Sequence, residues 1–468
     1  MAAEFIENHT FADIEIGQSA QIERTLTRDD IALFSKASGD FNPTHVDDEF
    51  ARSKGAEGVT AHSLWSTSLV SSLLGNVLPG PGTIYQKQDM AFQRPVVIGD
   101  TVTARIKARE KRDNNVVLFD CEVVNQKNEP VMTGLAEVVA PAEKIRIAKT
   151  DLPDVTVRHH DSYRELFEVL EGLEPIPAAL IHPCDYVSLK GAVDAAESGF
   201  IQPVLVGPEH RIRAVAEEHE IDIDPYRIED VEHSHAAAVR AVELVHTGDV
   251  EMLMKGSLHT DEVLGAVVSR STGIRTERRI SHVFAMDVPT YPKLLLITDA
   301  AVNVAPGLAE KADICQNAID LSHTLGIDQP KLAILSAMET VNPKVQSTLD
   351  AAALCKMADR GQITGGVLDG PLAMDNAINV QAAETKGIIS SVAGRADVLV
   401  APDLEAGNIL AKQLTFMGNA EAAGIVLGAR VPIILTSRSD GVRARRASAA
   451  LAVLHAHALR KKAMAGLQ

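Results

Sequence analysis

The stretch "AHSLWSTSLVSSLLGNVL", residues 61–78, decides the fold of the first part of the chain. It is long and largely apolar, which predicts a buried helix. The β-rich runs that follow it are separated by turn signals at residues 112–115 and 126–129. These runs are residues 83–92, 100–110, 114–125 and 130–140. One apolar helix followed by consecutive strands predicts an α+β domain in which an antiparallel sheet wraps around the helix.

Just upstream of this helix lies the polar loop "ASGDFNPTHVDDEF", residues 37–50, which has two interpretations. Pro43 suits the first turn of a helix running on through "THVDDEFARSK", so Asp40 or Asn42 would cap free backbone donors. Alternatively, Asp40 and His45 reach one water molecule and activate it as a carboxylate–imidazole pair. The spacing alone favours the cap.

The segment "GVTAHSLW", residues 58–65, strengthens the catalytic interpretation. It begins a helix, and the free backbone donors of a helix N-terminus can hold an acyl carbonyl oxygen as it becomes negative. His62 belongs to this segment but by itself is equally well explained as a packed histidine.

After residue 160 the sequence pattern changes to short apolar runs that alternate with Ala-rich helical stretches such as 188–199 and 348–361. Continuous apolar strands separated by helices predict a mostly parallel sheet covered on both faces. At this length the region divides into two α/β lobes with a cleft between them. We therefore expect an α+β domain at 1–145, a linker at 146–163, and a two-lobed α/β domain at 164–468. His159 and His160 are interpreted as solvated linker residues rather than a metal pair.

Composition restricts the class of protein. The chain has 468 residues, 46% hydrophobic, and a formal net charge of −18. A nucleic-acid-binding protein normally carries a basic face, so the negative net charge argues against nucleic-acid binding. The N-terminus "MAAEFIENHTF" lacks the basic and apolar regions of a signal peptide, and no apolar run has the ~18 residues of a membrane helix. We expect a cytoplasmic protein without nucleic-acid or membrane partners.

Three stretches of the second half carry candidate anion-binding groups. Each places charged or hydroxyl side chains where an apolar strand ends, and a helix N-terminus or a bidentate Arg there can bind phosphate. They are "LMKGSLHT" with Lys255, Ser257 and Thr260, "GVLDGPLAMDNA" with Asp369 and Asp375, and "IILTSRSDGVRARRAS" with Ser437, Arg438 and Asp440. The Arg run 443–446 is expected to be a solvated helix face. A P-loop and a G-x-G-x-x-G fingerprint are absent, which weakens a dehydrogenase interpretation.

The first part resembles the MaoC-type, R-specific enoyl-CoA hydratases of the hotdog fold. The resemblance covers residues ~10–140 and is carried by "FSKASGDFNPTHVDDEFA", "GVTAHSLWSTSLVSSLLG" and "MAFQRPVVIGDTV". It implies reversible addition of water to a trans-2-enoyl-CoA, with His45 as base toward water and Asp40 as its partner and proton donor to the α-carbon. Where the family has His-Gly, this chain has His62-Ser63. The family's Gly amide is an oxyanion donor, and Ser63 keeps the backbone N–H but adds a side chain.

The second part resembles the phosphate acetyl/butyryltransferases, whose two α/β lobes are similar to isocitrate dehydrogenase. The motifs include "MKGSLHT", "AILSAMETVNP" and "PIILTSRSD". The resemblance implies transfer of an acyl group between CoA and phosphate without a metal, with Arg438 binding phosphate and Ser437 as transition-state donor. Acetyl-type members place a base Asp several residues beyond the Arg; here the region is Ala/Arg-rich, which leaves Asp440, Asp369 and Asp375 as candidates. The segment "DGPLAMDNA" leans toward the butyryl-type branch.

We therefore predict a bifunctional enzyme, with CoA thioesters and inorganic phosphate as substrates and no tightly bound cofactor or metal. Both resembled families form dimers or larger assemblies, which implies a homo-oligomer. The main alternative is a phosphate acyltransferase whose hotdog domain only binds acyl-CoA or mediates oligomerisation. A dehydrogenase on the same two-lobed fold is a weaker alternative, because fold alone does not fix activity.

Overall fold

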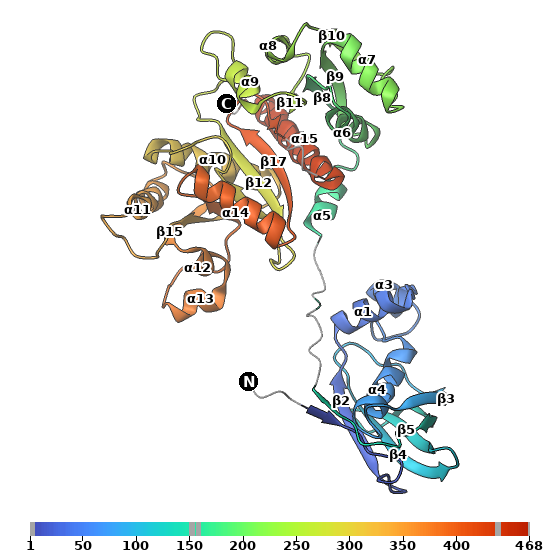
Figure 1. The fold of residues 1–468 in the computed structure, drawn as a ribbon. Helices are drawn as coiled ribbons and strands as arrows, with labels where there is room; N and C mark the ends of the chain where they lie inside the picture. The colour runs from blue at the N-terminus through green and yellow to red at the C-terminus, as the bar shows by residue number, and fades with distance from the viewer. Residues whose placement is uncertain (1–4, 149–154, 156–160, 436–440, 467–468) are drawn as a thin grey trace. The chain divides into compact units, whose positions relative to one another are not determined.

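The computed structural model describes residues 5–148, 155, 161–435 and 441–466. The chain forms two compact units, Met1–Val157 and Arg158–Gln468, called here the first and second unit (Figure 1). Two elements fall inside the predicted linker 146–163: strand β7 (Arg146–Ala148), which pairs with β1 (Phe5–Glu7), and the start of helix α5 (Ser162–Val169). The domain boundaries given above stay a prediction, and His159 and His160 lie outside the described residues.

The first unit is an antiparallel sheet packed on one long helix, as predicted. Helix α4 (Ser63–Asn76) contacts β2, β4 and β6, and its apolar side chains, among them Trp65, lie in the core of the unit. The sheet has the order β2-β4-β5-β6-β3. Its strands are β2 (Ser19–Thr25), β3 (Ile84–Phe92), β4 (Thr101–Arg112), β5 (Val116–Asn125) and β6 (Pro130–Val139). This wrapped-helix arrangement is the hotdog fold.

Local capping chemistry explains how the helix before the loop begins and ends. Helix α1 (Arg28–Ser38) starts at Thr27, whose hydroxyl accepts a hydrogen bond from the Asp30 amide while the Asp30 carboxylate accepts one from the Thr27 amide. Gly39 ends it in the left-handed conformation at φ 75°, which glycine adopts without steric cost. The chain is therefore turned sharply just before Asp40.

The second unit is built on one mixed sheet of 11 strands in the order β10-β9-β8-β11-β18-β17-β12-β13-β16-β14-β15. The five strands from β10 to β18 are parallel to one another, and so are the four from β13 to β15. β17 and β12 pair antiparallel between these groups, so the two groups run in opposite directions. They correspond to the two predicted lobes, which share one sheet.

The antiparallel insertion follows from the sequence, because the connection of residues 288–294 is too short for a crossover helix. The strands of the second unit are β8 (Ile176–Ile181), β9 (Ile201–Gly207), β10 (Arg227–Asp230), β11 (Met252–Lys255), β12 (Ser281–Asp287), β13 (Leu295–Thr298), β14 (Lys331–Leu335), β15 (Val367–Leu372), β16 (Val398–Val400), β17 (Glu421–Leu427) and β18 (Ile433–Ile434).

Helices cover this sheet, and α15 (Val442–Met464) is the longest of those described. It contacts α5, α6 and β17, and its middle is buried in the core (red helix in Figure 1). The remaining helices are α6 (Tyr186–Glu197), α7 (Glu209–Glu218), α8 (Ser234–Thr247), α9 (Thr260–Val267), α10 (Leu308–Thr324), α11 (Gln346–Asp359), α12 (Met374–Ile378), α13 (Val380–Thr385) and α14 (Leu404–Met417). The helices predicted at 188–199 and 348–361 are confirmed as α6 and α11, each shifted by two residues.

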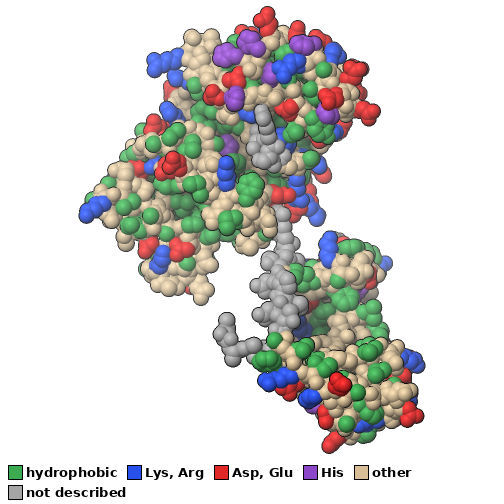
Figure 2. Space-filling model, viewed as in Figure 1, with side chains coloured by type: hydrophobic (Ala, Val, Ile, Leu, Met, Phe, Trp, Pro, Cys, Tyr) green, Lys and Arg blue, Asp and Glu red, His purple; other side chains and the backbone are tan. Residues whose placement is uncertain are grey.

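No helix in the described ranges combines the length and the apolar character needed to cross a membrane. On the face visible in Figure 2, Lys and Arg side chains lie interspersed with Asp and Glu.

Candidate functional site

The loop after α1 combines both interpretations given by its sequence. Asn42 caps the short helix α2 (Pro43–Val46), since its side-chain oxygen accepts a hydrogen bond from the Thr44 amide at 3.2 Å. The Asp40 carboxylate accepts from the Asn42 amide at 3.1 Å and is otherwise exposed. The predicted single helix is wrong: Asp47 is extended and separates α2 from α3 (Asp48–Ser53). This break leaves His45 in the last turn of α2.

The tautomer of the neutral His45 ring is set by a neighbouring carbonyl group. Its Nδ1 lies 2.8 Å from the carbonyl oxygen of Thr60, which can only accept a hydrogen bond. Nδ1 therefore carries the proton in the neutral ring, and Nε2 keeps a free lone pair. Such a backbone hydrogen bond sets the imidazole's orientation and makes Nε2 the proton acceptor.

The backbone just before Thr60 is held by Asp48, a residue that the sequence did not single out. The Asp48 carboxylate accepts from the Val59 amide at 3.1 Å and pairs with the Arg28 guanidinium at 2.9 Å. The hydrogen bond from Arg28 lowers the pKa of Asp48, so the carboxylate stays ionised. Its position three residues after His45 was visible in the sequence, but its partners were not.

His62 is buried, in contrast to the exposed Asp40. It is the residue preceding α4, and its Nε2 lies 3.0 Å from the carbonyl oxygen of Asp40. Its ring lies against that of His45, with the centroids 4.0 Å apart. One donor atom from each of Asp40, His45 and His62 lies within 4.8 Å of the others. Groups of this kind can hold a cation or share protons.

Ser63 is the first residue of α4 and is exposed. The amides of a helix's first turn have no carbonyl one turn earlier to bind. The first unit therefore brings an exposed carboxylate, an imidazole with a free lone pair and a helix N-terminus into one small region. These are the parts required to add a proton and a hydroxyl group to a double bond beside a carbonyl group.

In the second unit, Lys255 and Ser257 lie at the carboxyl end of β11. The amides of Gly256 and Ser257 donate to the carbonyls of Ile181 and His182, each at 2.9 Å, so this turn is fixed to the end of β8. His182 returns a hydrogen bond from Nδ1 to the Ser257 carbonyl at 2.9 Å. Sequence reasoning missed His182, although its place at a strand end before a proline is a readable signal.

Thr260 is the first residue of α9, directly after that turn. Strand β11 pairs in parallel with β18, so Leu435, which directly follows β18, lies at the same edge of the sheet. Ser437, Arg438 and Asp440 lie outside the described residues. The described residues on either side of this segment are Leu435 and Gly441.

Asp369 and Asp375 lie elsewhere in the second unit. Asp369 is in β15 and accepts from the Gly370 amide, and Asp375 in α12 pairs with Lys386 at 3.1 Å. The hydrogen bond from Lys386 lowers the pKa of Asp375. β18 is fifth and β15 eleventh in the strand order, a separation of six positions or roughly 29 Å along the sheet. The structure thus does not bring these carboxylates to the edge that holds Lys255.

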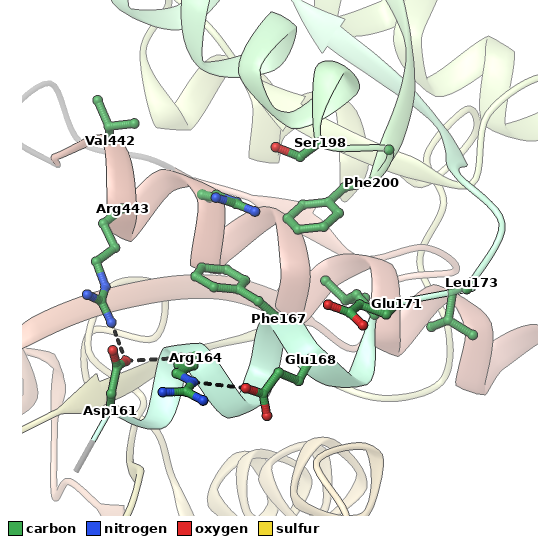
Figure 3. A pocket seen from close by; sticks show the side chains of 14 residues that line it. Asp161, Arg164, Phe167, Glu168, Glu171, Leu173, Ser198, Phe200, Val442 and Arg443 are labelled. Carbon is green, nitrogen blue, oxygen red and sulfur yellow. Dashed lines mark hydrogen bonds and ion pairs between the residues drawn. The ribbon is translucent and has the colours of Figure 1, made fainter. Parts of the chain in front are cut away.

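A hollow of about 780 Å³ lies between α5, the first turns of α15 and the turn before β9 (Figure 3). Arg443 in this hollow is paired with Asp161 and, at 3.0 Å, with Glu421. Arg446 lies over the rings of Phe167 and Phe200, 4.7 and 5.3 Å from their centroids.

The Arg run 443–446 is therefore only partly the solvated face that was expected. Arg443 and Arg446 are exposed but engaged, whereas Arg445 is buried, because α15 packs into the core of the unit.

Comparison with known proteins assigns both halves. Residues 233–453 match the family model "Phosphate acetyl/butaryl transferase", and residues 11–127 match "MaoC like domain". Over 294 residues the chain is 60% identical to a phosphate acetyltransferase of Rhizobium meliloti, covering 63% of this chain and 93% of the relative. The chain belongs to the phosphate acetyl/butyryltransferase family. Its first unit carries a MaoC-like domain of the hotdog fold.

This phosphate acetyltransferase homologue is also similar to a butyryltransferase in sequence and to a phosphotransacylase in structure. It is 40% identical to a phosphate butyryltransferase of Clostridium beijerinckii, over 61% of this chain and 96% of the relative. A branched-chain phosphotransacylase from Enterococcus faecalis has a similar structure, with a TM-score of 0.54 and 29% identity over 60% of this chain and 99% of that one. The family assignment removes the support for a dehydrogenase.

Proposed function

We propose that the chain is a bifunctional enzyme of CoA thioesters. The first unit hydrates trans-2-enoyl-CoA to 3-hydroxyacyl-CoA, and the second exchanges CoA and phosphate on an acyl group, forming acyl phosphate. The observation that carries the first activity is the Asp40–His45 pair with Nε2 of His45 left free by the Thr60 hydrogen bond. The second activity is supported by 60% identity to a phosphate acetyltransferase over 93% of its length.

Hydration proceeds by addition across the double bond. His45 Nε2 removes a proton from water, whose oxygen bonds to the β-carbon, and the electron pair of the double bond moves toward the carbonyl group. Amides at the N-terminus of α4 stabilise the negative oxygen. The proton taken up by His45 passes to the neighbouring Asp40 carboxylate, which delivers it to the α-carbon. The exposed Ser63 side chain at this N-terminus restricts the space for the acyl group.

Two variants test the hydratase activity. Asp40→Asn and His45→Gln remove proton transfer, so kcat for crotonyl-CoA hydration falls about 10²- to 10⁴-fold. Asp47→Asn is the matched control, because an Asn in the same loop still accepts from the Phe50 amide as Asp47 does. Wild-type rates in both catalytic variants would refute the assignment. Crotonyl-CoA binding without turnover in the wild type would instead support a non-catalytic hotdog domain.

For acyl transfer, phosphate attacks the thioester carbonyl and the CoA thiolate leaves. Arg438 holds phosphate, Ser437 donates to the transition state, and Lys255, Ser257 and Thr260 add positive charge and donors at the same edge. In the reverse direction, where the CoA thiol attacks acyl phosphate, Asp440 is the preferred base for the thiol proton, because Asp369 lies on a distant strand and Asp375 in the helix that follows it.

The test is release of CoA from acetyl-CoA that depends on phosphate. We expect it to collapse in Arg438→Ala and to persist in Arg430→Ala, where an exposed Arg binds His246 instead. Full activity of the Arg438 variant would exclude its role.

Acetyl is proposed as the preferred acyl group, since identity is 60% to the acetyltransferase relative and 40% to the butyryltransferase relative. This differs from the butyryl-type leaning of residues 369–377. A panel of C2 to C8 acyl-CoAs with phosphate decides: a higher kcat/KM for butyryl-CoA would reverse the proposal.

We also propose a cytoplasmic homo-oligomer. Among the described residues, strand β3 pairs with β6 alone, which leaves its other edge open, and its Ile84, Tyr85 and Phe92 are exposed. An open apolar edge favours pairing with a second copy. Light scattering coupled to size-exclusion chromatography would give the mass of the assembly, and a monomer would refute it.

A further inference from the structure

The hydrogen bonds of His62 separate it from the substrate-binding role that its place beside Ser63 first indicated. The Asp40 carbonyl oxygen can only accept, so the proton of the neutral His62 ring lies on Nε2, which donates to it at 3.0 Å. Ser35 Oγ lies 3.4 Å from the same nitrogen. Nδ1 is buried and has no hydrogen-bond partner among the described residues. A buried ring committed in this way does not donate to a substrate oxygen.

His62 instead connects the two parts of the hydration site. Its backbone precedes the first turn of α4, whose amides face the acyl oxygen in the proposed mechanism. Its side chain donates a hydrogen bond to the backbone carbonyl of Asp40, which lies 22 positions earlier in the chain and supplies the proton. This side chain therefore links the residue before α4 directly to the Asp40 backbone, in addition to the bonds that Thr60 makes with Thr44 and His45.

The same ring limits the movement of His45. The two rings lie 4.0 Å apart with 31° between their planes, while Nδ1 of His45 is tied to Thr60 on the other side. His45 is thus confined by one hydrogen bond and one ring contact, which holds Nε2 in a single orientation. His62 is buried and Asp40 is exposed, so a buried side chain of the site supports the backbone of an exposed one.

We propose that His62 is a positioning residue of the hydratase, which fixes Asp40 relative to the N-terminus of α4 and holds the ring of His45. The inference rests on the proposed hydratase function. It gives His62 no contact with substrate, and it predicts losses in turnover rather than in substrate binding.

Three variants test it with crotonyl-CoA. His62→Ala frees the Asp40 backbone, and a displacement of about 1 Å at a reacting group lowers kcat about 10²-fold, while KM stays within about threefold. His62→Gln keeps a donor at the position of Nε2 and restores kcat to within about tenfold of the wild type. Ser35→Ala is the matched control, since it alters the same surroundings but leaves the bond to Asp40 in place.

Two measurements separate positioning from loss of fold. Trp65 is the single tryptophan of the chain and is buried in the first turn of α4, so its fluorescence reports folding at this point. Nitrogen NMR of the imidazoles at neutral pH is expected to give Nε2–H for His62 and Nδ1–H for His45.

A folded His62→Ala variant with wild-type kcat overturns the proposal and leaves the hydratase function intact. So does an Nδ1–H tautomer for His62, or a raised KM with unchanged kcat. If the wild-type chain hydrates no enoyl-CoA, the proposed function itself fails and this inference fails with it.

Discussion

Gly256 gives the sharpest test of where the transferase site lies. It follows Lys255 at the end of β11, and a Cβ atom added to it would lie 2.5 Å from the carbonyl oxygen of Ile181 and 2.8 Å from that of His182. Ordinary carbon–oxygen contacts are about 3.3 Å or longer, so in Gly256→Ala the strands must separate by about 0.8 Å. Both neighbours are backbone atoms and cannot rotate away.

That shift acts on the turn that carries Lys255 and Ser257. It strains the 2.9 Å hydrogen bonds from the amides of Gly256 and Ser257 to β8. Misplacement by about 1 Å lowers turnover about 10²-fold, and overpacking of this kind lowers the free energy of unfolding by about 1–3 kcal/mol. We expect kcat for phosphate-dependent CoA release from acetyl-CoA to fall about 10²-fold in Gly256→Ala.

The chain supplies two controls. Gly265, in the next helix, has nothing within 4 Å of an added Cβ, so Gly265→Ala should keep its turnover and stabilise α9 by up to ~1 kcal/mol. Hydration of crotonyl-CoA by the first unit, measured on the same sample, should be unchanged. A Gly256→Ala enzyme with wild-type kcat would refute the assignment of this edge to the transferase site.

Three further predictions concern stability. Lys311 and Asp350 form a buried ion pair at 2.6 Å. Lys311→Met leaves the Asp350 carboxylate buried without its partner, so it should lower the free energy of unfolding by about 3–5 kcal/mol in urea titrations, and adding Asp350→Leu should recover most of this loss. A single variant as stable as the wild type would contradict this prediction. Burial lowers the pKa of His455 from 6.5 to about 4, so the unfolded chain binds its proton first and the free energy of unfolding falls as pH drops from 6.5 to 4. His455 contributes at most about 1.4 kcal/mol per pH unit to the slope of the free energy of unfolding against pH. This contribution should disappear in His455→Leu, and an unchanged slope would mean that other groups cause it. Thr27→Ala removes the cap of α1 and should cost about 1 kcal/mol in unfolding followed by Trp65 fluorescence; no change would mean that the cap is dispensable.

Short-range patterns made the elements of this protein readable from its sequence. The apolar run 61–78 and the strands after it each depend on residues within one element, so their prediction succeeded. Strand β2 was missed because it is mostly exposed and carries few apolar residues. The break at Asp47 was missed because the Pro43 signal marks where a helix begins and not where it ends.

The two families were predicted correctly from the sequence, and Asp40 and His45 are its proposal for the catalytic pair. The folded chain was needed to show which nitrogen of His45 is free, that His62 contacts the Asp40 backbone, and that Asp369 lies far from Lys255. The reason is the range of the interactions. His45 meets Thr60 across 15 residues and His62 meets Asp40 across 22, and the order of strands in the large sheet depends on crossovers. Periodicity and capping act over a few residues, so they define elements, whereas the path of the chain defines the sites.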